Sequence, residues 1–189
     1  AHVRSEDDGG THADAHAALL GALQFAAELI AVGTDMDAAC SVFLLEDALA
    51  LWVTAMRLAG VVGAAAPLFV PLLPRLPHIA ERTLEHMRAL AKLAELYLMH
   101  ADAAAVQAHM PALVGTLRAP LGNSKEQCQI WALRTLQLLV MLYPASTAAH
   151  AFDTVAFCIA HLLAGACRHA GARRACSRGE ARAELTAPA

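Results

Sequence analysis

Residues 43–56 read FLLEDALALWVTAM, and this stretch decides the fold of the chain. An α-helix turns by about 100° per residue, and on such a helix the apolar side chains of this stretch cover an arc of roughly 200°. A helix that lies on a single core needs an apolar stripe of only about 100°. The wider arc predicts helical neighbours in front of this helix and on both of its sides, which is the arrangement of a stack of helices.

The two faces of this helix differ in composition. The centre of the apolar arc is predicted to hold Leu45, Ala48, Leu49, Trp52 and Met56, with Val42, Leu44, Leu51, Val53 and Ala55 at its edges. The positions left for solvent are Glu46, Asp47, Ala50, Thr54 and Arg57. Trp52 is therefore expected in the core, and so is Trp131, which lies on the dry face of a later helix.

The composition is that of packed, alanine-rich helices. Of the 189 residues, 58% are hydrophobic, but 45 are alanine, which is the best helix former and only a weak hydrophobe. Few residues favour strands and 5% are aromatic, so the predicted class is all-α. Five scattered cysteines indicate reduced thiols rather than a disulfide framework. The net charge of −3 gives no overall basic field for nucleic acid.

No membrane-spanning segment and no signal peptide are predicted. A spanning helix needs about 18 or more uninterrupted apolar residues. The longest uncharged runs, residues 58–74 and 135–152, are interrupted by glycine or proline. The amino-terminal residues are acidic and polar, unlike those of a signal peptide. A small helical membrane protein is therefore only the third hypothesis for this chain, and we expect no membrane insertion.

Helix-start and helix-stop signals divide the chain into seven helices. Gly33 is expected to end the first helix. Thr34 and Asp37 resemble a capping box that starts the second helix, and Gly60 is expected to stop it. The predicted helices span residues 16–32, 34–60, 64–80 (short and kinked by prolines), 81–100, 103–117 (interrupted near Pro111), 124–143 (after a turn at Gly122-Asn123, with a capping box at Ser124) and 147–164.

Three of these helices carry an apolar–aromatic pair of residues near their ends. The pairs Leu51-Trp52, Leu96-Tyr97 and Leu142-Tyr143 lie 45 and 46 residues apart. Helix pairs that repeat every ~40–47 residues are typical of HEAT and armadillo proteins. The predicted architecture is therefore an α-solenoid of HEAT-like antiparallel helix pairs, about three and a half repeats long.

The predicted solenoid covers residues 15–166. Residues 1–14 are expected to form a disordered acidic tail, and residues 167–189 a disordered arginine-rich tail. Neither end of the solenoid looks like a polar cap, and the chain begins at Ala1. We therefore expect this segment to come from a longer protein.

Residues 44–52, LLEDALALW, resemble the segment Leu-Leu-Glu-Asp-Gly-Leu-x-Leu-Trp of importin-11-like nuclear transport receptors, which belong to the karyopherin-β family. Ala48 stands where that family has glycine. The proline-rich residues 71–77, the segment 94–97 and residues 151–165 follow in a similar order, so that the resemblance covers residues 16–165.

The resemblance implies a soluble receptor that carries protein cargo through nuclear pores and works in both cytoplasm and nucleus. In this family the GTPase Ran binds an amino-terminal region that this chain lacks. Ran and nuclear pore proteins would therefore be bound through the full-length receptor, and this fragment would supply a section of its C-terminal superhelix. The alternative hypothesis is a HEAT-repeat scaffold or regulatory subunit unrelated to transport.

Glu46 and Asp47 are the candidate binding residues. Adjacent side chains on a helix diverge by about 100°, so these two carboxylates do not form a catalytic pair. Their functional interpretation is an acidic contact for a basic cargo. The alternative is a solvated face, or a bond between adjacent repeats.

The sequence contains no recognisable catalytic or nucleotide-binding motif. It has no P-loop, no G-x-G-x-x-G after a strand and no G-x-S-x-G, so we predict no enzyme activity and no cofactor. Five Cys and His residues near the carboxyl end are possible zinc ligands, but they lack the C-x-x-C or H-E-x-x-H spacing of a zinc site. These residues are Cys158, His161, Cys167, His169 and Cys176. No metal is therefore predicted.

Overall fold

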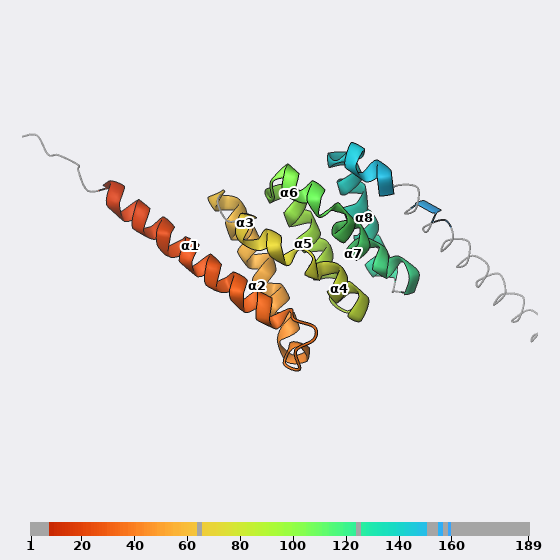
Figure 1. Ribbon diagram of the computed structural model, residues 1–189, viewed down its shortest axis with the longest axis horizontal. Coiled ribbons are helices and arrows are strands. Elements are labelled where there is room, and N and C mark those ends of the chain that lie inside the picture. Colours follow the sequence, from red (N-terminus) through yellow and green to blue (C-terminus); the bar gives the residue numbers. More distant parts are fainter. Residues whose placement is uncertain (1–7, 64–65, 124–125, 151–154, 157–158, 160–189) are drawn as a thin grey trace, which may run out of the picture. The chain divides into compact units, whose positions relative to one another are not determined.

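The computed structural model describes residues 8–63, 66–123, 126–150, 155–156 and 159. Its elements are α1 (Asp8–Gly33), α2 (Ser41–Val62), α3 (Ala66–Phe69), the 3-10 helix η1 (Val70–Leu72), α4 (Arg75–Arg82), α5 (Met87–His100), α6 (Ala103–Ala108), α7 (Met110–Asn123) and α8 (Glu126–Leu142) (Figure 1). The chain divides into two compact units, Ala1–Thr147 and Ala148–Ala189, and all of these elements lie in the first. The described residues contain no strand, which confirms the all-α class.

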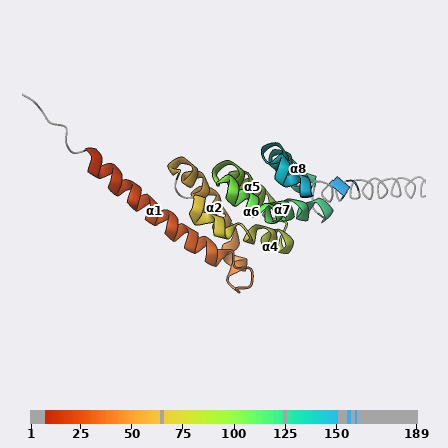
Figure 2. The ribbon, with the colours of Figure 1, turned by 45° about the horizontal axis from the view of Figure 1, so that its top comes forward.

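The helices of the first unit pair and stack. α1 packs against α2, and α7 packs against α8. The second helices of successive pairs, α2, α5 and α8, contact one another in that order, while α4 contacts α7 in the other layer (Figures 1 and 2). A further helix begins at Pro144, directly after the third pair. The fold is therefore an α-solenoid of about three and a half repeats, as predicted.

Hydrogen bonds between neighbouring repeats have the predicted period. Trp52 donates to Tyr97, 45 residues further along the chain, at 3.2 Å. Arg82 pairs with Asp37, also 45 residues away, at 3.2 Å. Equivalent positions thus face each other from one repeat to the next, as in a stack of ~40–47-residue units.

α2 buries the stripe that the sequence predicts. Its five central positions, residues 45, 48, 49, 52 and 56, are at most 7% exposed. The five positions predicted for solvent are all exposed. At the edges of the arc, Ala55 is buried and Leu51 and Val53 are half-buried, but the prediction for Leu44 is wrong, since this side chain is 41% exposed. α1, α3 and α5 pack against α2 but do not cover the Leu44 side chain completely.

The prediction that Thr34 and Asp37 start the second helix is wrong. α2 begins only at Ser41. The Thr34 hydroxyl instead donates to the carbonyl of Ile30 at 2.6 Å, which closes the end of α1. It also accepts a hydrogen bond from the Arg75 guanidinium at 3.2 Å. This arginine comes from the next repeat, so a tertiary contact holds Thr34 at the end of α1.

Gly60 does not stop α2, which continues to Val62. Gly63 ends the helix instead, with a φ of +72° that glycine adopts without strain, and its N–H donates to the carbonyl of Ala59 at 3.0 Å. Gly60 has a packing role. A Cβ at this position would lie 2.6 Å from the ring of His100 in α5.

Prolines break the first helix of the second repeat more completely than predicted. The segment expected as one kinked helix over residues 64–80 consists of α3, η1 and α4. Pro71 lacks a backbone N–H, and the Leu73 N–H bonds to the Val70 carbonyl at 3.1 Å in a tighter 3-10 turn. Because α4 extends beyond the expected end, α5 begins later than predicted, at Met87.

The third repeat also differs from the prediction at its boundaries. α6 and α7 are separate helices, and the break at His109 lies next to the predicted interruption at Pro111. Gly122 and Asn123 are not a turn but the last residues of α7. The predicted capping box at Ser124 lies outside the described residues.

α1 begins at Asp8, before the predicted boundary at residue 14. The alanines of this stretch favour helix propagation. Most of the predicted last helix and the whole arginine-rich tail lie outside the described residues. The domain boundaries at residues 14 and 166 stay predictions.

One helix in the described part of the chain, Ala13–Gly33, is long and apolar enough to cross a membrane. The prediction of no span rested on the longest uncharged runs, and this segment is not one of them because it contains Asp14 and Glu28. Mostly buried core helices and signal sequences satisfy the same criterion; 11% of the most apolar window of this segment is buried, and α1 packs against α2. Length and composition alone therefore do not make α1 a membrane helix.

A chain of buried hydrogen bonds connects the first two repeats. Trp52 Nε1–H donates to the Tyr97 hydroxyl at 3.2 Å, and Tyr97 donates to the Phe69 carbonyl. The two rings meet edge to face with centroids 6.2 Å apart. In a regular helix the Phe69 carbonyl would accept from the Leu73 N–H, but that N–H bonds to Val70. Burial raises the pKa of Tyr97 against the smaller lowering effect of the Trp52 bond, so the hydroxyl keeps its proton.

Tyr97→Phe is expected to lower the free energy of unfolding by about 1–3 kcal/mol, because the Phe69 carbonyl and the Trp52 N–H lose a buried partner. Chemical denaturation measures this loss. The matched control is Tyr143→Phe, because Tyr143 is only half-buried, and it should change the free energy by less than about 0.5 kcal/mol. Equal losses in the two variants would contradict a special role for Tyr97.

Gly33→Ala is expected to separate α1 from α2. The new Cβ would lie 2.6 Å from the Cβ of Ala48, and neither atom can rotate away. The free energy of unfolding should fall by about 1–3 kcal/mol, and adding Ala48→Gly should restore most of it, as urea denaturation can measure. Gly21→Ala is the control on the same helix, because the new Cβ meets open space. This substitution should stabilise the protein by about 0.5–1 kcal/mol, since alanine is a better helix former than glycine. Similar effects at positions 21 and 33 would rule out this close approach.

Candidate interaction surface

Glu46 and Asp47 lie on the exposed side of α2. Within the described part of the chain, neither carboxylate forms an ion pair or hydrogen bond with another side chain. The structure brings them together only as neighbours on one helix, and the bond between adjacent repeats that the sequence left open is not formed among these residues. Their use in binding stays a prediction.

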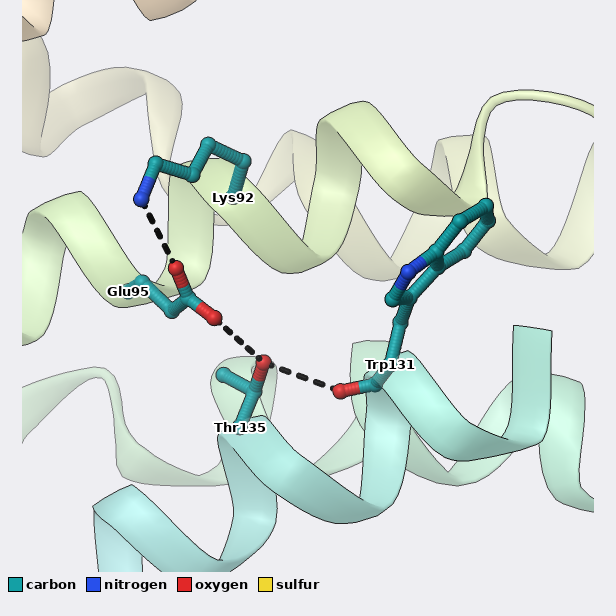
Figure 3. Close-up of polar contacts among 4 residues, drawn as sticks. All are labelled: Lys92, Glu95, Trp131 and Thr135. Atoms are coloured by element: carbon teal, nitrogen blue, oxygen red, sulfur yellow. Dashed lines mark hydrogen bonds and ion pairs between the residues drawn. The ribbon is translucent and has the colours of Figure 1, made fainter. Parts of the chain in front are cut away.

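In α5, the second helix of the following repeat, two charged side chains form an ion pair with each other. Lys92, which lies 45 residues after Asp47, pairs with Glu95 at 2.9 Å. The other oxygen of Glu95 is 3.4 Å from the hydroxyl of the buried Thr135 in α8. Figure 3 shows that this hydroxyl also faces the Trp131 carbonyl, at 3.1 Å. Glu95 therefore links α5 to the following repeat.

The two tryptophans differ in burial. Trp52 is completely buried, as predicted, whereas Trp131 is only half-buried. Trp131 was predicted to lie in the core, and its burial is less complete than that prediction. α8 has apolar residues on more than one side, including the exposed Leu133 and Val140, so an apolar face did not guarantee a covered one.

The first helix pair is strongly acidic. Residues 8–62, which hold α1 and α2, contain seven Asp and Glu and one Arg, whereas residues 63–134 contain five Asp and Glu and seven Lys and Arg. Six of the seven carboxylates are exposed: Asp14, Glu28, Asp35, Asp37, Glu46 and Asp47. Attraction for a positively charged partner is therefore concentrated at this end of the stack. The whole-chain charge of −3 conceals this segregation, and a count by helix pair reveals it.

Large apolar side chains are exposed on the same helix pair. The exposed fraction is 61% for Phe25, 47% for Leu29 and 57% for Val32 in α1, and 83% for Phe43 in α2. Sequence reasoning missed them because α1 is apolar on two sides and only the packing shows which side is covered. Charge and apolar area are features that bind other molecules without covalent chemistry.

Metal ligands do not gather in the part of the chain that is described. No group of three or more His, Cys, Asp or Glu side chains there could hold a metal ion. Most of the cysteines and histidines that were considered for zinc, from position 158 onwards, lie outside that part.

A family model described as importin-11-like, TPR repeats, matches residues 20–170. The chain belongs to this importin-11-like family. The match extends over the stacked helices and includes residues 44–52, so it confirms the resemblance seen in that segment. No curated protein and no solved structure matches the chain.

Importin-11-like proteins are transport receptors and not a family of enzymes. The family description speaks of TPR repeats, whose unit is ~34 residues long. The bonds between repeats in this chain join residues 45 apart, an offset of HEAT size. TPR and HEAT repeats are both stacks of helix pairs, and this chain has the longer unit.

Proposed function

We propose that this chain is part of a nuclear transport receptor that binds protein cargo for Ran-dependent import through nuclear pores. The observation that carries this proposal is the importin-11-like family match over residues 20–170. The stacked repeats agree with it, because solenoids present extended surfaces to protein partners. Cargo is the partner proposed for this segment, and Ran and nuclear pore proteins bind through the full-length receptor. The receptor accordingly works in the cytoplasm and the nucleus.

Glu46 and Asp47 are the proposed contacts for a basic segment of the cargo. Both side chains are exposed on the acidic first helix pair, and neither is committed to an ion pair among the described residues. Exposed charges of this kind accelerate association and select partners by sign. Their contribution to binding should therefore weaken as salt is added.

Release by Ran is the first test. Cargo is bound to the immobilised full-length receptor and then eluted with Ran loaded with GTP or with GDP. The proposal expects release by the GTP form only, because Ran and cargo oppose each other's binding through a coupling free energy. Cargo that stays bound under both conditions would instead support a HEAT-repeat scaffold unrelated to transport.

Charge neutralisation at α2 is the second test. Glu46→Gln with Asp47→Asn should weaken binding of a basic cargo by about three- to tenfold at low salt, and the difference should shrink at high salt. Fluorescence anisotropy of labelled cargo measures the dissociation constants. Glu81→Gln with Glu85→Gln is the matched control, because these carboxylates are also exposed but belong to the second repeat. An equal effect of the two double variants would exclude a specific contact at α2.

A further inference from the structure

The second helices of the three repeats, α2, α5 and α8, match one another at a spacing of 45 residues. Trp52 and Tyr97, which are hydrogen-bonded across two of these helices, lie 45 residues apart. Buried positions recur at the same spacing, as Leu45, Leu90 and Thr135 and as Leu49, Ala94 and Leu139. Residues 45 positions apart therefore occupy equivalent places on the three helices and lie on the same side of them.

α5 shows which side of a second helix stays open inside a stack of repeats. It packs against α2 on the one hand and α8 on the other (Figures 1 and 2). Arg88 nevertheless remains exposed, and Met99 is 62% exposed. A further repeat would pack on α2 or α8 as these helices pack on α5. The positions of α2 and α8 that are equivalent to Arg88 would therefore stay open in a longer stack.

These equivalent positions are Phe43 in α2 and Leu133 in α8, and together with Arg88 they form an open row across the three helices. The exposed fraction is 83% for Phe43 and 48% for Leu133. Within the described part of the chain, Arg88 forms no ion pair or hydrogen bond with another side chain. One turn further along the helices, the equivalent positions are polar and consist of Asp47, Lys92 and Gln137.

We propose that the open row binds an extended segment of the cargo, which places a carboxylate on Arg88 and large apolar side chains on Phe43 and Leu133. The two apolar residues of the segment lie three positions before and three positions after the acidic one. This proposal rests on the proposed function, because the segment belongs to the cargo. It adds a contact of opposite charge to the one proposed at Glu46 and Asp47.

The spacing of the row favours a segment in the polyproline II conformation. Packed helices lie about 8–10 Å apart, so neighbouring members of the row are separated by roughly that distance. A polyproline II helix has three residues per turn and rises about 3.1 Å per residue, so every third side chain points to the same side at steps of about 9 Å. In a β-strand, residues three positions apart point to opposite sides.

The composition of the row also favours a narrow partner. An α-helix is about 10–12 Å wide with its side chains and would cover the neighbouring polar row as well, where Lys92 already forms an ion pair. An extended segment can contact the open row alone. Arginine binds a carboxylate through two parallel hydrogen bonds, and apolar contacts on both sides of such a pair exclude water from it. Arg88 therefore selects an acidic residue at the centre of the segment.

Three labelled peptides of about 12 residues test this proposal on the purified chain. The first has the core Leu-Pro-Pro-Glu-Pro-Pro-Leu, in which the prolines favour the extended conformation. The second has lysine in place of glutamate, and the third has the composition of the first with the two leucines next to the glutamate. Fluorescence anisotropy gives the dissociation constants. We expect the first peptide to bind at least about tenfold more tightly than either of the others.

Charge reversal locates the acidic residue. Arg88→Glu should weaken binding of the glutamate peptide by about tenfold or more and should strengthen binding of the lysine peptide. Arg88→Ala should weaken the first without strengthening the second, and circular dichroism checks that both variants keep their helices. Arg57→Glu is the matched control, because this arginine is also exposed on a second helix but lies outside the open row. It should leave the preference for glutamate unchanged.

Removal of the apolar side chains tests the two ends of the row. Phe43→Ser with Leu133→Ser should weaken binding of the glutamate peptide by about tenfold. The fold should tolerate this change because both side chains are already exposed. Phe25→Ser with Leu29→Ser is the matched control, since these side chains of α1 are 61% and 47% exposed but lie outside the row. Binding should be unchanged in the control.

Several results would overturn the proposal. Equal binding of the glutamate and lysine peptides would remove the role of Arg88, and equal binding of the third peptide would remove the spacing. Tighter binding of a helical peptide with the same three residues seven positions apart, about 10.5 Å, would replace the extended segment by a helix. None of these measurements involves Ran. Release of cargo by Ran without these peptide preferences would therefore contradict the open row alone, and the converse result would contradict the transport function alone.

Discussion

The hydrogen-bonded, edge-to-face contact between Trp52 and Tyr97 is the interaction on which the arrangement of the first two repeats depends. The prolines of the second repeat break its first helix and leave the Phe69 carbonyl without its helical partner. Tyr97 supplies that partner and at the same time accepts the indole N–H of Trp52. One buried hydroxyl therefore satisfies polar groups from two other elements. This matters because an unsatisfied buried polar group costs as much as a whole hydrogen bond contributes.

Contacts at the edges of this core set how closely the helices approach. Within the first repeat, Gly33 allows α1 to come close to α2; between the first two repeats, Gly60 makes room for the ring of His100. Arg75 reaches from the second repeat to the last turn of α1, where it donates to the Ala31 carbonyl and to Thr34. A cation at the carboxyl end of a helix is favourable because it meets the negative end of the helix dipole. A glycine and one long cation thus join the first two repeats at the edges of the core.

The surface features point towards binding rather than chemistry. Carboxylates are concentrated on the first helix pair, and cations prevail over the next two. The acidic pair also exposes Phe25, Leu29 and Phe43. Charge selects partners at long range, and apolar area holds them at contact. Both features suit the importin-11-like family of transport receptors, to which this chain belongs.

The sequence by itself determined the helical class, the repeat length of about 45 residues and the buried stripe of α2, because these depend on periodicity and composition. It also determined the exposure of Glu46 and Asp47, which lie opposite that stripe, and the family, through residues 44–52. Only the tertiary structure decided that Thr34 closes α1, that Gly60 accommodates His100 and that Phe25 remains uncovered. In each case the outcome depends on a side chain from another repeat, or on the absence of one. Helix periodicity and capping rules take account of residues a few positions apart on one helix. They do not take account of side chains that packing brings close from 40 or more residues away.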